Sequence, residues 1–136
     1  MNLKKIEHIG IAVKNLEESS GLFADLFGAQ PYKDEDVESE GVKTRFFAMG
    51  ESKIELLAAT SENSAIHKFI EKKGEGIHHL AFEVEDIFKE MERLKGLGYQ
   101  LLADTPKEGA DNKLICFLHP KSTNGVLIEL CQEKRN

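Results

Sequence analysis

The sequence repeats itself once, about seventy residues along, and this duplication constrains the fold more than any other feature. Residues 6–13 read IEHIGIAV, and residues 77–84 read IHHLAFEV. The shorter segment IEL at 54–56 returns at 128–130. Each half of the chain therefore carries a histidine on one strand-like run and a glutamate on a later one. A duplication of this kind indicates two copies of one supersecondary unit.

Hydrophobic periodicity predicts the same order of elements in both halves, namely β-α-β-β-β. In the first half Asn15 caps the helix and Gly28 ends it, and in the second half Asp86 caps a helix through Leu94. Three strands of the first half are expected at 3–13, 42–49 and 53–58, and an acidic stretch at 34–36 leads into the second of these. The expected strands of the second half are 76–84, 100–103, 113–118 and 125–131.

Two further segments connect these elements. A polar, partly helical connection spans 61–75, and the polar loop 106–112 is predicted to be a mobile lip over a site. We therefore expect one domain over 1–136, made of two modules at about 1–60 and 76–136.

The composition narrows the classes of function. The chain has 136 residues and a formal net charge of −6, without a basic stripe, which argues against nucleic-acid binding. No apolar run approaches the roughly 18 residues needed to span a bilayer, and no signal segment is evident at the N-terminus. Cys116 and Cys131 lie in apolar runs and are expected to be buried, reduced thiols. We expect a cytoplasmic protein without a membrane partner.

Side chains alternate between the two faces of a strand, which separates an apolar face from a second face in each duplicated strand. His8, Glu55, His79 and Glu129 all fall on that second face. A single histidine or glutamate on a strand is usually solvated or hydrogen-bonded. Four of them at matched positions of a repeat instead favour a common site, provided that the second face is concave.

Two imidazoles and two carboxylates form a donor set of intermediate hardness. Such a set suits one divalent ion, Co²⁺, Mn²⁺, Ni²⁺, Fe²⁺ or Zn²⁺, with positions left open for water or substrate. The absence of thiolates from the set argues against a structural zinc site.

The sequence resembles the vicinal oxygen chelate superfamily, which includes glyoxalase I, bleomycin-resistance proteins and extradiol dioxygenases. Within it the chain is most similar to the methylmalonyl-CoA epimerases. The residues that carry the likeness are 8–13 (HIGIAV), 53–57 (KIELL), 76–82 (GIHHLAF), 119–122 (HPKS) and 125–130 (GVLIEL). The resemblance implies an α+β fold of two tandem βαβββ modules, whose sheets form a cupped, incomplete barrel around a metal site.

The resemblance also implies site residues and chemistry. His8, His79 and Glu129 correspond to metal ligands, Glu55 occupies a fourth ligand position, and cobalt is the favoured metal. Glu129 is the expected proton-transfer base, acting on the α-proton of a methylmalonyl thioester. Residues 41–46 hold no carboxylate where some members carry a second base, so Glu38, Glu40 or a bound water is left for that role.

Other expectations concern the substrate, the alternatives and the assembly. The CoA moiety is expected to contact Lys107, Lys113, Lys121 and Ser122. Two alternatives remain open: a lactoylglutathione lyase that isomerises a hemithioacetal, and a non-enzymatic ligand-binding protein of the same fold. We expect a homodimer, as is common among proteins that the chain resembles.

Overall fold

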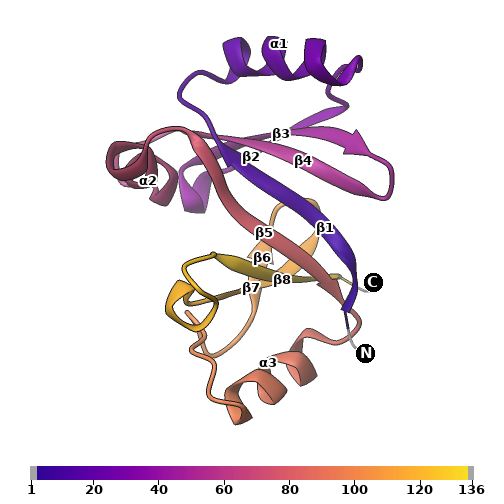
Figure 1. The fold of residues 1–136 in the computed structure, drawn as a ribbon, viewed down its shortest axis with the longest axis vertical. Helices are drawn as coiled ribbons and strands as arrows, with labels where there is room; N and C mark the ends of the chain where they lie inside the picture. The colour runs from indigo at the N-terminus through magenta and orange to yellow at the C-terminus, as the bar shows by residue number, and fades with distance from the viewer. Residues whose placement is uncertain (1–2, 135–136) are drawn as a thin grey trace. The chain divides into compact units, whose positions relative to one another are not determined.

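The structure is a computed structural model that describes residues 3–134. Within this range three α-helices and eight β-strands are joined by turns and two short 3-10 helices, which confirms the α+β fold class (Figure 1). No helix in this range has the length and the apolar character needed to cross a membrane.

The described residues divide into two compact units. The N-terminal unit comprises residues 9–78, and the C-terminal unit comprises residues 3–8 together with 79–134. Strands β1 (Leu3–Ala12) and β5 (Gly76–Val84) each run from one unit into the other. The compact units therefore differ from the sequence modules at these two strands.

The N-terminal unit contains the strand order β2-β3-β4-β1 and two helices. Its strands β2 (Lys33–Val37), β3 (Val42–Met49) and β4 (Ser52–Ala59) are antiparallel neighbours. Strands β3 and β4 form a hairpin across Gly50, whose φ of 62° glycine adopts without steric cost. Helix α1 (Leu16–Phe27) has the predicted caps, Asn15 and Gly28. Helix α2 (Ala65–Lys73) lies in the connection that was expected to be partly helical.

The alternating side chains of β4 pack into two different clusters. Ile54, Leu56 and Ala58 contact residues of α1, including Phe23 and Phe27. Leu57 and Ala59 belong to a second cluster, which includes Ile66, Phe69 and Ile70 of α2. Strand β4 is thus covered on both faces, and Glu55 has the parity of the second face.

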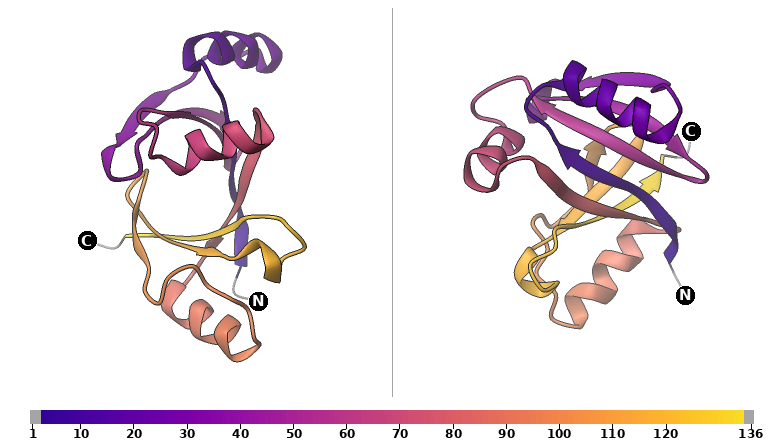
Figure 2. Two further views of the ribbon diagram at one scale, coloured as in Figure 1. Left: turned by 90° about the vertical axis from the view of Figure 1, so that its left-hand side faces the viewer. Right: turned by 45° about the horizontal axis from the view of Figure 1, so that its top comes forward.

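The C-terminal unit has the strand order β1-β5-β8-β7-β6 and one helix. Strand β8 (Ile128–Glu133) runs parallel to β5 and antiparallel to β7 (Lys113–Leu118), which pairs in turn with β6 (Lys107–Gly109). Helix α3 (Ile87–Gly96) begins after the predicted cap Asp86, whose carboxylate accepts the N–H of Lys89. The helix runs alongside β7 and β8 within this unit (Figure 2).

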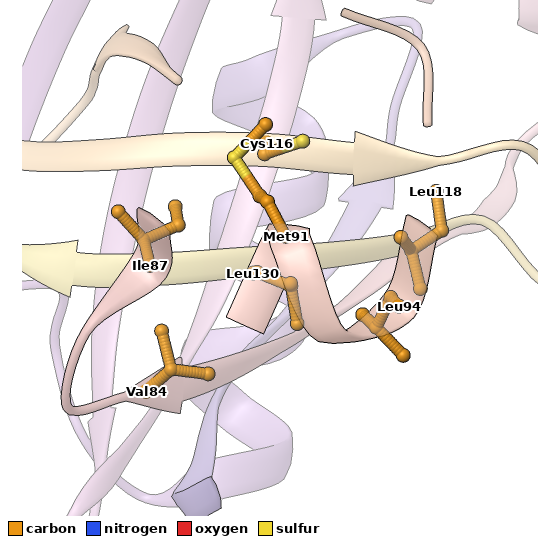
Figure 3. Packing of buried hydrophobic residues seen from close by; sticks show 7 residues of the cluster. All are labelled: Val84, Ile87, Met91, Leu94, Cys116, Leu118 and Leu130. Atoms are coloured by element: carbon orange, nitrogen blue, oxygen red, sulfur yellow. The ribbon is translucent and has the colours of Figure 1, made fainter. Parts of the chain in front are cut away.

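Burial of apolar side chains between α3 and the strands forms the core of the C-terminal unit. Figure 3 shows this cluster: Val84, Ile87, Met91, Leu94, Cys116, Leu118 and Leu130. The opposite face of the same strands carries a smaller cluster of Ala81, Ile115 and Cys131, with Phe117 beside it. His79 and Glu129 share the parity of this second face.

One expected strand of the second half was wrong, and one expected loop contains a short strand. Residues 100–103 form no strand among the described residues, because Leu101 makes only an isolated bridge to Leu118. Residues 107–109 of the expected polar loop 106–112 form β6, which pairs with β7, and the role of this loop as a mobile lip stays a prediction. Gly109 permits this pairing, since a Cβ at that position would lie 2.8 Å from Cδ1 of Ile115.

The start of β8 also differs from the prediction. The strand begins at Ile128 instead of residue 125. The preceding segment is held in a turn, in which the N–H of Gly125 donates to the carbonyl of Pro120 at 2.8 Å and that of Val126 to the carbonyl of Thr123 at 3.1 Å. Donors and acceptors used in this turn are not available to a sheet ladder.

Candidate active site

Three of the four predicted ligands meet inside the C-terminal unit: His8 on β1, His79 on β5 and Glu129 on β8. Their exposed fractions are 5%, 6% and 5%. The Nε2 atoms of the two imidazoles are 2.9 Å apart. The Glu129 carboxylate places Oε1 at 3.3 Å from Nε2 of His79 and Oε2 at 3.7 Å from Nε2 of His8. Donor atoms from three strands therefore converge on one point.

Strand pairing explains how His79 and Glu129 come together. In the parallel pair β5–β8, Ala81 lies opposite Glu129, and His79 lies two residues before Ala81 on the same face. The small side chain of Ala81 leaves space between them. The rings of His79 and Phe117 meet edge to face, with centroids 5.7 Å apart, so an apolar wall borders the site.

The donor set fits a divalent cation. The ligand atoms of His8, His79 and Glu129 all lie within 4.8 Å of one another. Metal–ligand bonds of about 2.1 Å place neighbouring donors roughly 3.0 Å apart at right angles and roughly 3.4 Å apart in a tetrahedron. The two imidazole nitrogens, 2.9 Å apart, agree with the first value. The two carboxylate oxygens each lie near one imidazole, Oε1 at 3.3 Å from Nε2 of His79 and Oε2 at 3.7 Å from Nε2 of His8, which is close to this range.

Glu7 also takes part in this arrangement, although sequence analysis assigned it no role. Its side chain is 2% exposed, and its Oε1 lies 2.9 Å from Nδ1 of His8. By strand alternation Glu7 belongs to the face opposite His8, so its sequence position gave no reason to expect the contact. The one signal in the sequence is a carboxylate directly before the strand histidine.

Glu55, the fourth predicted ligand, lies in the N-terminal unit on β4. Its side chain is only 4% exposed, which is unusual for a glutamate. A buried carboxylate requires compensation by hydrogen bonds, by a cation or by protonation. The ligand role of Glu55 stays a prediction from the sequence repeat.

The predicted CoA contacts all belong to the C-terminal unit but have different environments. Lys113 is buried, and its Nζ lies 3.1 Å from Oε1 of Glu133. The hydroxyl of Ser122 accepts the N–H of Gln100 at 2.9 Å and so fixes the 3-10 turn that it ends. Lys107 and Lys121 are exposed. Only these two place their charge in solvent, and the binding roles of all four residues stay predictions.

The two cysteines are buried, as expected. Burial raises the pKa of the Cys131 thiol, and the nearby Glu129 and Glu7 carboxylates raise it further. Its Sγ lies 3.5 Å from the carbonyl oxygen of Phe82. The thiol therefore stays protonated at neutral pH, which makes it a poor nucleophile and a poor metal ligand.

His78 precedes His79 in the sequence but has a different environment. Its ring meets that of Phe69 on α2 edge to face, with centroids 5.0 Å apart. Burial lowers its pKa to about 4, so the ring is neutral at pH 7. This packing agrees with the structural role that its strand parity suggests.

Comparison with known proteins agrees with this fold and site. Residues 7–117 match the family described as Glyoxalase/Bleomycin resistance protein/Dioxygenase superfamily, and the chain belongs to that superfamily. Within it the chain is similar to proteins named methylmalonyl-CoA epimerase. The ethylmalonyl-CoA/methylmalonyl-CoA epimerase of Cereibacter sphaeroides is 41% identical over 94% of this chain and 97% of that protein.

Two solved structures extend the likeness to three dimensions. The methylmalonyl-CoA epimerase of Mycobacterium tuberculosis superposes with a TM-score of 0.93 and 33% identity, over 98% of this chain and 90% of that one. A methylmalonyl-CoA epimerase in complex with methylmalonyl-CoA and NH4+ gives 0.90 and 34%, over 96% of this chain and 95% of the other.

Proposed function

We propose that this protein is a metal-dependent epimerase that interconverts the 2R and 2S forms of methylmalonyl-CoA. The observation that carries the proposal is the buried set of His8, His79 and Glu129, whose donor atoms lie within 4.8 Å of one another. Its support is the likeness, over nearly the full chain, to epimerases that act on this acyl-CoA.

The metal ligands in this proposal are His8, His79 and Glu129, with Glu55 as the fourth on the strength of the sequence repeat. When bound, a divalent cation supplies Lewis-acid stabilisation of the negative charge that develops on the substrate oxygens. The two imidazoles must be unprotonated at Nε2 to act as ligands, and the carboxylate must be ionised. The buried site excludes water, which strengthens each of these interactions.

Glu129 is the proposed base for the α-proton. A base must lie within hydrogen-bond reach of the proton that it removes, and a carboxylate with two oxygens can turn one of them toward the substrate. The methylmalonyl carbon loses its proton to Glu129 on one face and receives a proton on the other. Glu38, Glu40 and a bound water are the alternatives for this second transfer.

The test is exchange of the α-proton with solvent. Methylmalonyl-CoA of one configuration is incubated in D₂O with the metal-loaded protein, and proton NMR follows the loss of the α-proton signal. The proposal requires exchange together with interconversion of the two isomers. Absence of exchange with every one of the five metals would refute it. Turnover of methylglyoxal with glutathione would assign the site to a glyoxalase-type isomerisation instead.

Three finer points belong to the same proposal. Cobalt is the proposed metal, and elemental analysis of protein purified without chelator tests it. A homodimer is the proposed assembly, and light scattering on the purified protein measures it. The cytoplasm is the proposed compartment, and cell fractionation checks it.

A further inference from the structure

The ring of His8 has two different neighbours at its two nitrogen atoms. Its Nε2 faces Nε2 of His79 at 2.9 Å and Oε2 of Glu129 at 3.7 Å. Its Nδ1 faces Oε1 of Glu7 at 2.9 Å. All four side chains lie in the C-terminal unit and are at most 6% exposed. One ring nitrogen is therefore directed at the candidate metal position and the other at a buried carboxylate.

This arrangement selects one tautomer of the ring. When Glu7 is ionised its carboxylate can only accept hydrogen bonds, and the contact of 2.9 Å then requires that Nδ1 of His8 carries the proton. In a neutral imidazole Nε2 then presents its lone pair, as a metal ligand must. A carboxylate that accepts the other N–H of a ligand histidine also makes the ring more basic and fixes its orientation.

Burial adds a reason why Glu7 needs this contact. A carboxylate at 2% exposure has lost its hydration, and only hydrogen bonds and positive charge can offset that loss. Neighbouring residues of a regular strand point to opposite faces, so strand geometry alone does not bring Glu7 to the ring of His8.

We propose that Glu7 is a positioning residue, which accepts the Nδ1 proton of His8 and thereby fixes Nε2 as the nitrogen that binds the metal. The inference rests on the proposed metal-dependent function. Its tautomeric part, however, concerns the metal-free protein and can be tested without any metal.

The first measurement is the tautomer of His8, read from long-range ¹⁵N–¹H correlation spectra of the metal-free protein. The native chain is expected to show the Nδ1-protonated form. Glu7→Leu, which removes the acceptor at similar volume, should lose that preference. Glu7→Gln, whose neutral amide oxygen is a weaker acceptor than a carboxylate, should lose part of that preference and is the variant to use if Glu7→Leu fails to fold.

The second measurement is metal affinity, from competition of Co²⁺ with a chromophoric chelator. Loss of an outer partner of a ligand histidine weakens metal affinity by about 10- to 100-fold. We expect Glu7→Leu to lose affinity by a factor in that range and Glu7→Gln to lose less. Glu90→Gln is the matched control, because Glu90 is a carboxylate at 1% exposure in the same unit, bonded to Arg93 on α3. It should leave both the affinity and the tautomer unchanged.

The outcomes separate this inference from the proposed function. An Nε2-protonated His8 in the native chain, or an Nδ1-protonated population that is undiminished in every Glu7 variant that folds, overturns the positioning role even if the protein binds metal. Loss of affinity with an unchanged tautomer also overturns it, because Glu7 would then act through its charge alone. A third outcome is that the native chain binds no metal, while the Nδ1 proton of His8 is present in the native chain and lost in the variants. That outcome refutes the proposed function and supports the Glu7–His8 interaction.

Discussion

His8 and His79 are separated by 71 residues in the sequence, and their Nε2 atoms lie 2.9 Å apart. Their rings meet edge to face, with an interplanar angle of 86°. Two buried imidazoles in this geometry share one proton or one cation between their nitrogen atoms. This pair is therefore the most direct place to test the metal site.

Replacing His79 with alanine should weaken metal binding more than loss of an outer partner does, by more than about 100-fold, because a direct donor disappears. Chelator competition measures the change. His67→Ala is the control, since His67 lies on α2 in the N-terminal unit and pairs with Glu71. Equal affinities of the native chain and His79→Ala would remove His79 from the ligand set.

Replacing Glu129 with glutamine should slow α-proton exchange by about 10²- to 10⁴-fold, the usual contribution of a general base. The amide keeps the shape of the side chain but cannot take up a proton. Exchange is measured by NMR in D₂O at saturating metal. Glu92→Gln, on the exposed side of α3, should retain the native rate. An unchanged rate in Glu129→Gln would assign the proton transfer to another group.

Removal of the metal should abolish exchange and lower the stability of the protein, because a ligand that binds only the folded state stabilises it. At a free metal concentration of 100 times Kd the gain is about 2.7 kcal/mol. Urea unfolding with and without a chelator gives the difference. Readdition of metal should restore both properties, and identical unfolding midpoints would contradict a metal site of this affinity.

The ion pair of Asp34 and Arg45 should make stability depend on pH. Nε and Nη2 of Arg45 each donate to Asp34 at 2.7 Å, and these hydrogen bonds lower the pKa of the Asp34 carboxyl. A carboxyl whose pKa is lower in the folded state contributes stability above its unfolded pKa of about 3.9 and loses it as pH falls through the folded value.

Asp34→Asn should accordingly lower the free energy of unfolding at pH 7 by about 0.5 to 1 kcal/mol, as for other partly exposed pairs. The difference from the native chain should narrow as pH falls below about 4. Urea titrations at several pH values measure it. A difference that stays constant with pH would show that the variant acts by some route other than the charge.

Gly109→Ala should destabilise the β6–β7 pairing. The added Cβ would lie 2.8 to 3.1 Å from three side-chain atoms of Ile115, whose branched side chain has little freedom to move. Overpacking of this kind costs about 1 to 3 kcal/mol. The control is Gly21→Ala, where a Cβ has open space within α1 and should stabilise the helix by roughly 0.5 to 1 kcal/mol. Thermal or urea unfolding compares the two.

Local signals in the sequence were sufficient for most of the elements. The caps Asn15, Gly28 and Asp86 and the strands β3, β5 and β7 lie where periodicity and capping chemistry place them. These features depend on capping residues, which form short-range hydrogen bonds, and on the alternation of apolar and polar residues along a strand. Both can be read directly from the sequence. A strand was expected at 100–103 and is absent, and β6 at 107–109 was expected to be loop, because whether so short a segment pairs depends on its neighbours in the fold.

The duplication predicted that His8, Glu55, His79 and Glu129 belong to one site, since matched positions on matched strands share a face. Only the tertiary structure determined that the donor atoms of His8, His79 and Glu129 converge, because this depends on the parallel register that sets Ala81 opposite Glu129. It also brought Glu7 to the Nδ1 of His8, against the parity of the strand. Parity is a property of the local backbone, whereas register arises from packing between distant segments, and a single sequence does not encode it in any readable pattern.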